Sequence, residues 1–348
     1  MELCFVDVAQ GSASVILLGG GRAIVIDCGG LQARTVISLL SRFRVSTITR
    51  LIVTHNHADH SAGAVAILTA YQNRVDEIWM VYDTVLADSV FWERVEEDVT
   101  AGRLTEEQIF RLEYRNGPTE VYRGDGMLLT AIAPSMLGNL RAIRDANPNA
   151  TSGVLVMKRD GKQVVFSGDS TIPEWQAIRR QRGRPIECLL LTVPHHAGKV
   201  WEEQRPGETD AVFSARVRAE LDWLYTDAIE AEVGVVSVGT SNSYRHPRAE
   251  VLDAFRRNGG TVFCTQMTSR CDRDLETQRR RALPLLLPSR SSPTMQRTAR
   301  GASSNVACGG TLVVEFVAGV VTILRLAEHQ ATVSRVPQVA GQRPLCRR

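Results

Sequence analysis

The segment THNHADHSAG, residues 54–63, follows the apolar run 48–53 and places three histidines and one aspartate within six positions. Imidazole nitrogens and carboxylate oxygens are the protein ligands of zinc, manganese and iron. Alternate side chains of an extended segment share a face, so His55 and His57 converge on one ion. Asp59 and His60 enter the next turn and can bind a second ion. The spacing predicts a two-metal site, because four such residues in six positions are improbable in an ordinary polar loop.

This His-x-His-x-Asp-His pattern after an apolar strand resembles the signature of the metallo-β-lactamase fold superfamily. The resemblance implies an α/β fold, a four-layer αββα sandwich with helical insertions, and a dinuclear site along one edge. Two later segments fit it. VVFSGDS, residues 164–170, contains Asp169 where the family places a carboxylate that bridges both metals. LLLTVPHHAG, residues 189–198, contains His195 and His196 where the family places its last ligand, and which of the two faces metal stays open.

Within that superfamily the chain is most similar to the ComEC-type domain, the metallo-β-lactamase domain of a bacterial DNA-uptake channel family. The similarity extends over residues 3–325 and is strongest at its motifs. These motifs are FVDVAQGSA (5–13) with IVIDCGG (24–30), PHHAG (194–198), VSVG (236–239) with Asn242, Tyr244, His246 and Pro247, and VFCT (262–265). The resemblance implies a nuclease or phosphodiesterase.

One ligand of many metallo-β-lactamase enzymes is missing. No histidine occurs between Ser61 and Pro194, where those enzymes supply a third histidine to the first metal. The polar segment 147–152 corresponds to the Asn/Ser segment that ComEC-type domains carry there. An oxygen-richer site is harder, which makes manganese a candidate beside zinc. Asn149 and Ser152 can equally form an ordinary turn before the strand 153–158.

Composition is that of a globular chain. Its 348 residues are 44% hydrophobic and 23% charged, which predicts one large domain over 1–326 and a basic flexible tail over 327–348. Insertions are expected at about 88–118, 199–230 and 272–305. Apolar runs are of strand length and the first residues lack the features of a signal peptide, so we expect no membrane segment, a cytoplasmic location and no transport function.

Local patterns predict strands and helices that alternate along the chain. Strands are expected at 3–8, 14–18, 23–27, 48–53 and 77–82, with a terminal hairpin at 311–316 and 320–324. Helices are expected at 33–42, 62–71 and 247–258, and an acidic helical segment over 91–115 that is broken at Ala101-Gly102. Trp201, Trp223 and Tyr225 either wall a substrate groove and stack on bases or pack in the core.

Cysteines and charge give weaker signals. Seven cysteines without a Cys-x-x-Cys pair indicate reduced, mostly buried thiols, and we assign them no chemistry. A net charge of +3 does not by itself indicate nucleic-acid binding. The Arg-rich segment 272–305 either follows a phosphate backbone or is a solvated linker.

A polar cluster precedes the helix expected at 247–258. Hydroxyls, amides and cations at a helix N-terminus suit a phosphate group. Alternatively Asn242 and His246 cap the helix. The candidate substrate-binding residues are Ser241, Asn242, Tyr244, Arg245 and His246.

These residues lead to a hypothesis for the site. His55 and His57 hold the first of two divalent ions, zinc or manganese; Asp59, His60 and one of His195 or His196 hold the second; Asp169 bridges them. A water that both ions bind has a pKa near neutrality and attacks a phosphodiester of DNA or RNA. Asp59 and His246 are the candidate catalytic residues, and His246 positions the phosphate or protonates the leaving oxygen.

Two alternatives stay open, because fold does not fix substrate. One is a hydrolase of a small-molecule ester, lactone or thioester, with a narrow pocket. The other is a non-catalytic or partner-activated component of a larger defence (antiviral) or DNA-processing complex. Such a component would dock on a protein partner through the acidic helix or the Arg-rich loop.

Overall fold

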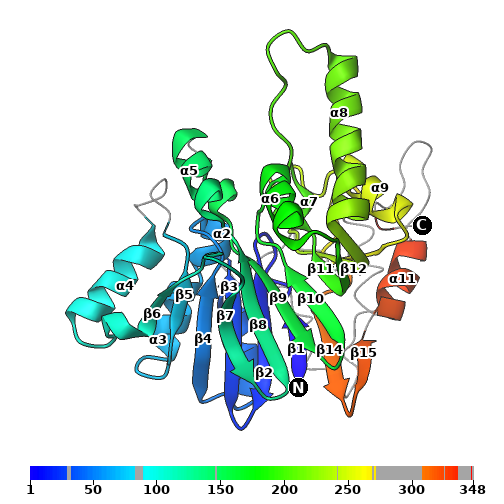
Figure 1. The fold of residues 1–348 in the computed structure, drawn as a ribbon. Helices are drawn as coiled ribbons and strands as arrows, with labels where there is room; N and C mark the ends of the chain where they lie inside the picture. The colour runs from blue at the N-terminus through cyan, green and yellow to red at the C-terminus, as the bar shows by residue number, and fades with distance from the viewer. Residues whose placement is uncertain are drawn as a thin grey trace.

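The computed structural model describes residues 1–29, 33–82, 89–145, 147–240, 242–268, 270–271, 308–324, 326–335 and 346. Two sheets face each other, and helices cover both outer faces (Figure 1). In the described residues the strands are β1 (Glu2–Phe5), β2 (Ala13–Gly19), β3 (Arg22–Cys28), β4 (Thr47–Val53), β5 (Ile78–Met80), β6 (Ile109–Arg111), β7 (Thr119–Gly124), β8 (Met127–Ala133), β9 (Val154–Arg159), β10 (Lys162–Phe166), β11 (Ile186–Thr192), β12 (Ile229–Val236), β13 (Thr261–Cys264), β14 (Leu312–Val317) and β15 (Val320–Leu324).

Helices occupy the segments between these strands. The α-helices of the described part are α1 (Ala33–Arg42), α2 (Ala58–Ser61), α3 (Ala64–Ala70), α4 (Val90–Thr100), α5 (Met136–Asp145), α6 (Ile172–Arg182), α7 (Pro194–Ala197), α8 (Asp210–Trp223), α9 (Ala249–Arg257) and α11 (Leu326–Arg335). Short 3-10 turns η2 (Glu106–Gln108) and η3 (Pro148–Thr151) and a π-helical turn η4 (Leu224–Ala228) complete them.

The first sheet has the order β15-β14-β1-β2-β3-β4-β5-β6, and its strands from β3 to β6 are parallel. Its central strands β1 to β4 are largely buried on both faces, which explains why most of their residues are apolar. In β3, Ile24 and Ile26 face the other sheet, whereas Ala23 and Val25 face the helices α1, α3 and α4.

The second sheet has the order β13-β12-β11-β10-β9-β8-β7, with β10 to β13 parallel. Val164 and Phe166 of β10 point to the first sheet, and Val165 between them packs with α6, α8 and α9 on the outside. One apolar layer lies between the two sheets, and one lies between each sheet and its outer helices. The expected αββα sandwich is therefore confirmed.

The parallel strands bring the predicted motifs to one edge. β4 ends at Val53, β10 at Phe166, β11 at Thr192 and β12 at Val236, each just before a polar segment. Carboxyl ends of neighbouring parallel strands lie at the same edge of a sheet, so the loops that leave them meet. Figure 1 shows α2 and α7 at this edge, with α5 beside them and α8 projecting beyond it.

Two expectations need correction. The segment 91–115 breaks after Thr100, where α4 ends, as expected, but its second half is not helical, because Ile109–Arg111 forms the edge strand β6 beside β5. Residues 326–335 form α11 rather than a flexible tail, because His329 and Val333 are buried against the body of the protein. Of the two alternatives for the aromatics of the second insertion, core packing is confirmed, since Trp201 and Tyr225 are buried in a core cluster and Trp223 packs against that cluster.

Some predictions fall outside the described residues. These are the Arg-rich segment 272–305, Ser241, and most of the tail beyond residue 335. No helix in the described part of the chain is long and apolar enough to cross a membrane.

Candidate metal centre

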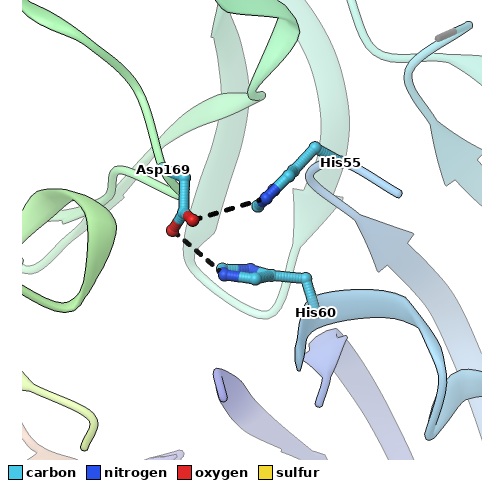
Figure 2. Close-up of side chains that lie close together, drawn as sticks. All are labelled: His55, His60 and Asp169. Carbon is cyan, nitrogen blue, oxygen red and sulfur yellow. Dashed lines mark ion pairs between the residues drawn. The ribbon is translucent and has the colours of Figure 1, made fainter. Parts of the chain in front are cut away.

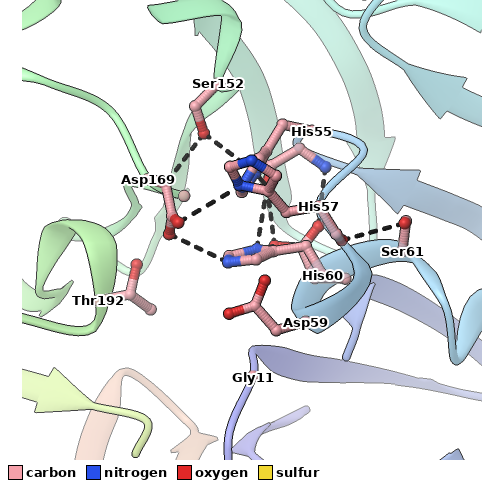
Figure 3. A network of polar contacts seen from close by, with 12 residues as sticks. Gly11, His55, His57, Asp59, His60, Ser61, Ser152, Asp169 and Thr192 are labelled. Atoms are coloured by element: carbon pink, nitrogen blue, oxygen red, sulfur yellow. Dashed lines mark hydrogen bonds and ion pairs between the residues drawn. The ribbon is translucent and has the colours of Figure 1, made fainter. Parts of the chain in front are cut away.

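The His-x-His-x-Asp-His turn connects β4 to α2. The side chains of its first two histidines are in contact, because Nε2 of His55 lies 3.0 Å from Nδ1 of His57. The hydroxyl of Ser61 donates to the carbonyls of Asn56 and His57 and fixes the turn. The backbone N–H of Ser12 donates to the carbonyl of Asp59 at 2.8 Å, so the loop after β1 supports the turn from the other side. Figure 3 shows the turn with its supporting residues.

Asp169 lies opposite this turn, just after β10. Its Oδ2 is 3.5 Å from Nε2 of His55 and 3.6 Å from Nε2 of His195. Its Oδ1 is 3.0 Å from Nε2 of His60 and 3.7 Å from Nε2 of His196. Figure 2 shows the carboxylate between His55 and His60. Each oxygen thus faces a different pair of imidazoles.

Both paired histidines turn inward. His195 and His196 have left-handed backbone angles, with φ of 52° and 53°. Nδ1 of His195 lies 2.7 Å from the carbonyl of Lys199, and Nδ1 of His196 lies 2.9 Å from that of Ser237. These contacts direct both Nε2 atoms into the site, the arrangement by which an outer carbonyl orients a metal-binding imidazole.

Two groups of donors are close enough to hold ions. One comprises His55, His60 and Asp169, and the other comprises Asp59, His60 and His196; within each group all ligand atoms lie within 4.8 Å of one another. A cavity of about 20 Å³ is lined by His60, Asp169 and His196. Oδ1 of Asp169 is buried, and its neighbours are the Nε2 atoms of His60 and His196. A carboxylate oxygen grouped with imidazole nitrogens is a donor set that suits zinc and similar cations.

The charge state of the imidazoles also fits metal. Burial, followed by the charge of His60, lowers the pKa of His55. Burial and the charge of His55 lower the pKa of His57 to about 4. Both rings are therefore neutral near pH 7 and offer a lone pair. His60 differs: burial lowers its pKa, but the carboxylates of Asp169 and Asp27 raise it well above its ordinary value.

The carboxylates remain ionised. Burial raises the pKa of Asp169, yet the charges of His60, His195 and His196 outweigh it and hold that pKa well below its ordinary value. Burial also opposes the ionisation of Asp59, but the hydrogen bond to His196 and the charge of His60 lower its pKa. Oδ2 of Asp59 lies 3.4 Å from Nε2 of His196. Two anionic carboxylates beside the neutral imidazoles of His55 and His57 suit divalent ions.

A supporting shell was not identified from the sequence. Asp27, at the end of β3, accepts from the backbone N–H and the hydroxyl of Thr54 at 2.8 Å, and its Oδ2 is 2.8 Å from Nδ1 of His60. Ser152 accepts from the N–H of Asp169 at 2.8 Å and lies 3.5 Å from Nδ1 of His55. The buried Ser152 therefore does more than form a turn. Asp27 lies in the segment IVIDCGG (24–30), and its place at the end of an apolar strand is the only feature of the sequence that points to a role for it.

The loop 242–246 closes the site. The His246 ring lies 5.2 Å from that of His195 and 6.0 Å from that of His196. Gly198 permits this approach, because a Cβ there would lie 2.0 Å from Cε1 of His246. Burial and the charges of His196 and His195 lower the pKa of His246 to about 3. The ring is neutral near pH 7, which disfavours the expected role as proton donor to the leaving oxygen.

The other predicted substrate residues separate into two kinds. Asn242 donates to the carbonyls of Gly239 and His246 and accepts from the N–H of His246, so its amide braces the loop instead of facing a substrate. Neither Asn242 nor His246 caps a helix, because Arg248 is the N-cap of α9. Tyr244 and Arg245 are exposed, and the ring of Tyr244 lies 5.8 Å from that of His246.

Comparison with solved structures finds distant similarities. YhfI from Bacillus subtilis, a metallo-beta-lactamase fold protein, has 14% identity and a TM-score of 0.43 over 76% of this chain and 95% of that chain. Human tRNase Z, short form, has 15% identity and a TM-score of 0.39 over 69% and 92%. Unliganded yeast PDE1 has 12% identity and a TM-score of 0.43 over 76% and 96%. None of these similarities is strong enough to indicate which substrate this chain acts on.

The sequence itself gives a clearer result. No curated protein matches it. The Lactamase_B family, described as the metallo-beta-lactamase superfamily, matches residues 6–199, which is more than half of the chain and includes the turn at 55–60, Asp169 and both paired histidines. The chain belongs to the metallo-beta-lactamase superfamily, a superfamily of metallo-hydrolases.

Proposed function

We propose that this protein is a metal-dependent phosphodiesterase that cleaves nucleic acid, DNA or RNA. The observation that carries the proposal is the exposed pair Tyr244 and Arg245 beside the histidine cluster. An aromatic ring can stack on a base, and a guanidinium binds phosphate oxygens in pairs. The motifs that resemble ComEC-type domains support the same substrate class.

The chain offers donors for two divalent ions, zinc or manganese. His55, His57 and His195 would hold the first ion, and Asp59, His60 and His196 the second, with Asp169 between them. His195 takes the place of the third histidine that the sequence lacks, since its Nε2 approaches the same oxygen of Asp169 as that of His55 does. When bound, two such ions polarise a phosphate and supply a nucleophilic water.

The remaining residues orient the substrate. The neutral His246 donates or accepts a hydrogen bond beside His195 and so positions the scissile phosphate. Arg245 binds a neighbouring phosphate, and Tyr244 stacks on the adjoining base. Asp59 serves as a ligand rather than as a proton acceptor, because its lowered pKa makes it a weak base.

A second candidate rests on helix α5. Its side chains Met136, Leu137, Leu140 and Ile143 are all more than half exposed, and the helix packs on η3, which leads to Ser152 at the metal centre. An exposed apolar face beside a hydrolytic site suits an ester, lactone or thioester with an apolar chain. This is a small-molecule hydrolase.

One experiment separates the two candidates. The protein, loaded with zinc or manganese, is assayed with single-stranded DNA, double-stranded DNA, RNA, a nitrophenyl phosphodiester and a medium-chain acyl ester. We expect nucleic-acid cleavage that Asp169→Asn abolishes and Leu140→Gln leaves unchanged. Cleavage of the acyl ester alone, reduced by Leu140→Gln, would establish the second candidate. No turnover of any substrate by the loaded protein would indicate a non-catalytic component.

A further inference from the structure

Four of the seven cysteines gather at the outer edge of the second sheet. Cys264 ends β13, Cys271 follows in the next turn, Cys308 precedes β14, and Cys346 comes after α11. All four side chains are buried, between 1% and 5% exposed. They belong to separate chain segments, so only the fold brings them together.

Backbone contacts fix their positions. The N–H of Cys308 donates to the carbonyl of Thr265, and that of Gly309 to the carbonyl of Cys264, both at 3.0 Å, which holds Cys308 beside Cys264. The N–H of Cys271 donates to the carbonyl of Thr268 at 2.9 Å and turns the chain back. Sγ of Cys346 lies 2.7 Å from Sγ of Cys264.

A buried histidine joins the group. His329 of α11 is fully buried, and its Nε2 accepts from the N–H of Cys264 at 3.3 Å. Its ring lies 4.7 Å from that of Phe263. The docking of α11 therefore takes place at the cysteines.

The thiols shift one another's pKa values. A hydrogen bond to Cys346, burial and the charges of Cys346, Cys271 and Cys308 raise the pKa of Cys264 well above its ordinary value. The same hydrogen bond outweighs burial, and with His329 it lowers the pKa of Cys346 to about 5. The four thiols therefore lie close enough to influence one another's ionisation.

The other three cysteines differ. Cys4, Cys28 and Cys188 lie singly in strands β1, β3 and β11. For each, burial is the largest cause of a raised pKa, followed by one neighbouring carboxylate. They are protonated core residues, so clustering is a property of the four alone.

We propose that Cys264, Cys271, Cys308 and Cys346 bind one structural zinc ion beside the docking site of α11 on β13. Four thiolates form the common tetrahedral set for structural zinc. The 2.7 Å between Cys264 and Cys346 exceeds a disulfide bond, which is about 2.05 Å. Among the described residues, no three of these sulfurs lie within 4.8 Å of one another, so the proposal requires the side chains to move towards the ion when it binds.

The test uses cobalt as a spectroscopic substitute for zinc. Thiolate ligands give cobalt an intense charge-transfer absorption in the near ultraviolet, which imidazole and carboxylate ligands do not. We expect this band in the cobalt-grown protein and its loss in Cys271→Ser and Cys308→Ser. Cys188→Ser is the matched control and should keep it. Asp169→Asn should also keep it, which separates this site from the proposed hydrolytic centre.

A second measurement avoids variants that fail to fold. Mercurial reagents displace zinc from thiolates, and the released zinc is read with a colorimetric chelator in wild-type protein. We expect one zinc per chain to be released as four thiols react, and zinc at the histidine centre to stay bound. Absence of released zinc, a chain mass two hydrogens lower than the reduced form, or iron with labile sulfide in place of zinc would each overturn the proposal.

Discussion

Oδ2 of Asp27 lies 2.8 Å from Nδ1 of His60, while Nε2 of the same ring faces Asp169 at 3.0 Å. The imidazole is held between an outer and an inner carboxylate, so Asp27 sets the orientation of a proposed ligand without contacting the ion. We expect Asp27→Asn to weaken metal binding by about 10- to 100-fold. Competition with a chromophoric chelator measures this. Asp125→Asn, at an exposed ion pair, is the control, and equal affinities in the two variants would contradict the role of Asp27.

Gly168 gives a prediction with a close control. Its φ is +50°, and a Cβ would lie 2.3 Å from the hydroxyl of Ser152, which holds the N–H of Asp169. Gly161 has a φ of +72° with nothing within 4 Å of a Cβ. We expect Gly161→Ala to cost about 1–2 kcal/mol of backbone strain. Gly168→Ala should cost more and also reduce bound metal. Urea unfolding and metal content report the two effects, and similar behaviour of both variants would exclude the steric argument.

A substitution of Arg245 tests whether the substrate is a nucleic acid. If its guanidinium binds a phosphate of the substrate strand, Arg245→Ala should reduce the slope of log affinity against log salt by about 0.7 for single-stranded DNA. Hydrolysis of a small nitrophenyl phosphodiester should be unchanged, because that substrate is too short to reach the residue. Fluorescence anisotropy over a salt series measures the slope. Arg123→Ala on β7 is the matched control, and an identical slope in both variants would remove Arg245 from the binding surface.

Glu174 makes stability depend on pH. Burial, against hydrogen bonds from Ser135, raises its pKa from 4.5 to about 7. Because the folded-state pKa is the higher one, its contribution is fully present below pH 4.5 and is lost as pH rises through 7. We expect unfolding free energy to fall between pH 5 and 8.5, and Glu174→Gln to remove up to about 3 kcal/mol of that fall. Chemical denaturation at the two pH values tests this against the exposed Glu187→Gln, and parallel profiles would refute it.

The sequence predicts the parts of this site that are local. His55, His57, Asp59 and His60 share one turn, and their spacing alone places them together. The sandwich follows as well, since apolar runs such as 48–53 and 189–193 have strand length and are buried on both faces. Asp27 and Ser152 escape such reasoning, because each is a common polar residue at a strand end whose role depends on a partner far along the chain.

Two incorrect predictions from the sequence, those for α11 and for β6, have a physical cause. In α11 a buried position is taken by His329, a polar residue, which hides the apolar face that marks a docked helix. The strand β6 is only three residues long, too short for a period of two to stand out beside the acidic helix before it. The choice between His195 and His196 could not be made from spacing, since left-handed backbone angles turn both inward.

Strand β1 lies between β2 and β14 in its sheet. The amino group of Met1 donates to the carbonyl of Phe316, 315 positions later, at 3.4 Å. The loop that leaves β1 in turn supports Asp59 through Ser12. During synthesis this strand has only one neighbour until β14 emerges from the ribosome, and contacts of such long sequence separation form slowly. The support that this loop gives to Asp59 is therefore complete only after β14 has been synthesised, later than every proposed ligand of the candidate metal centre.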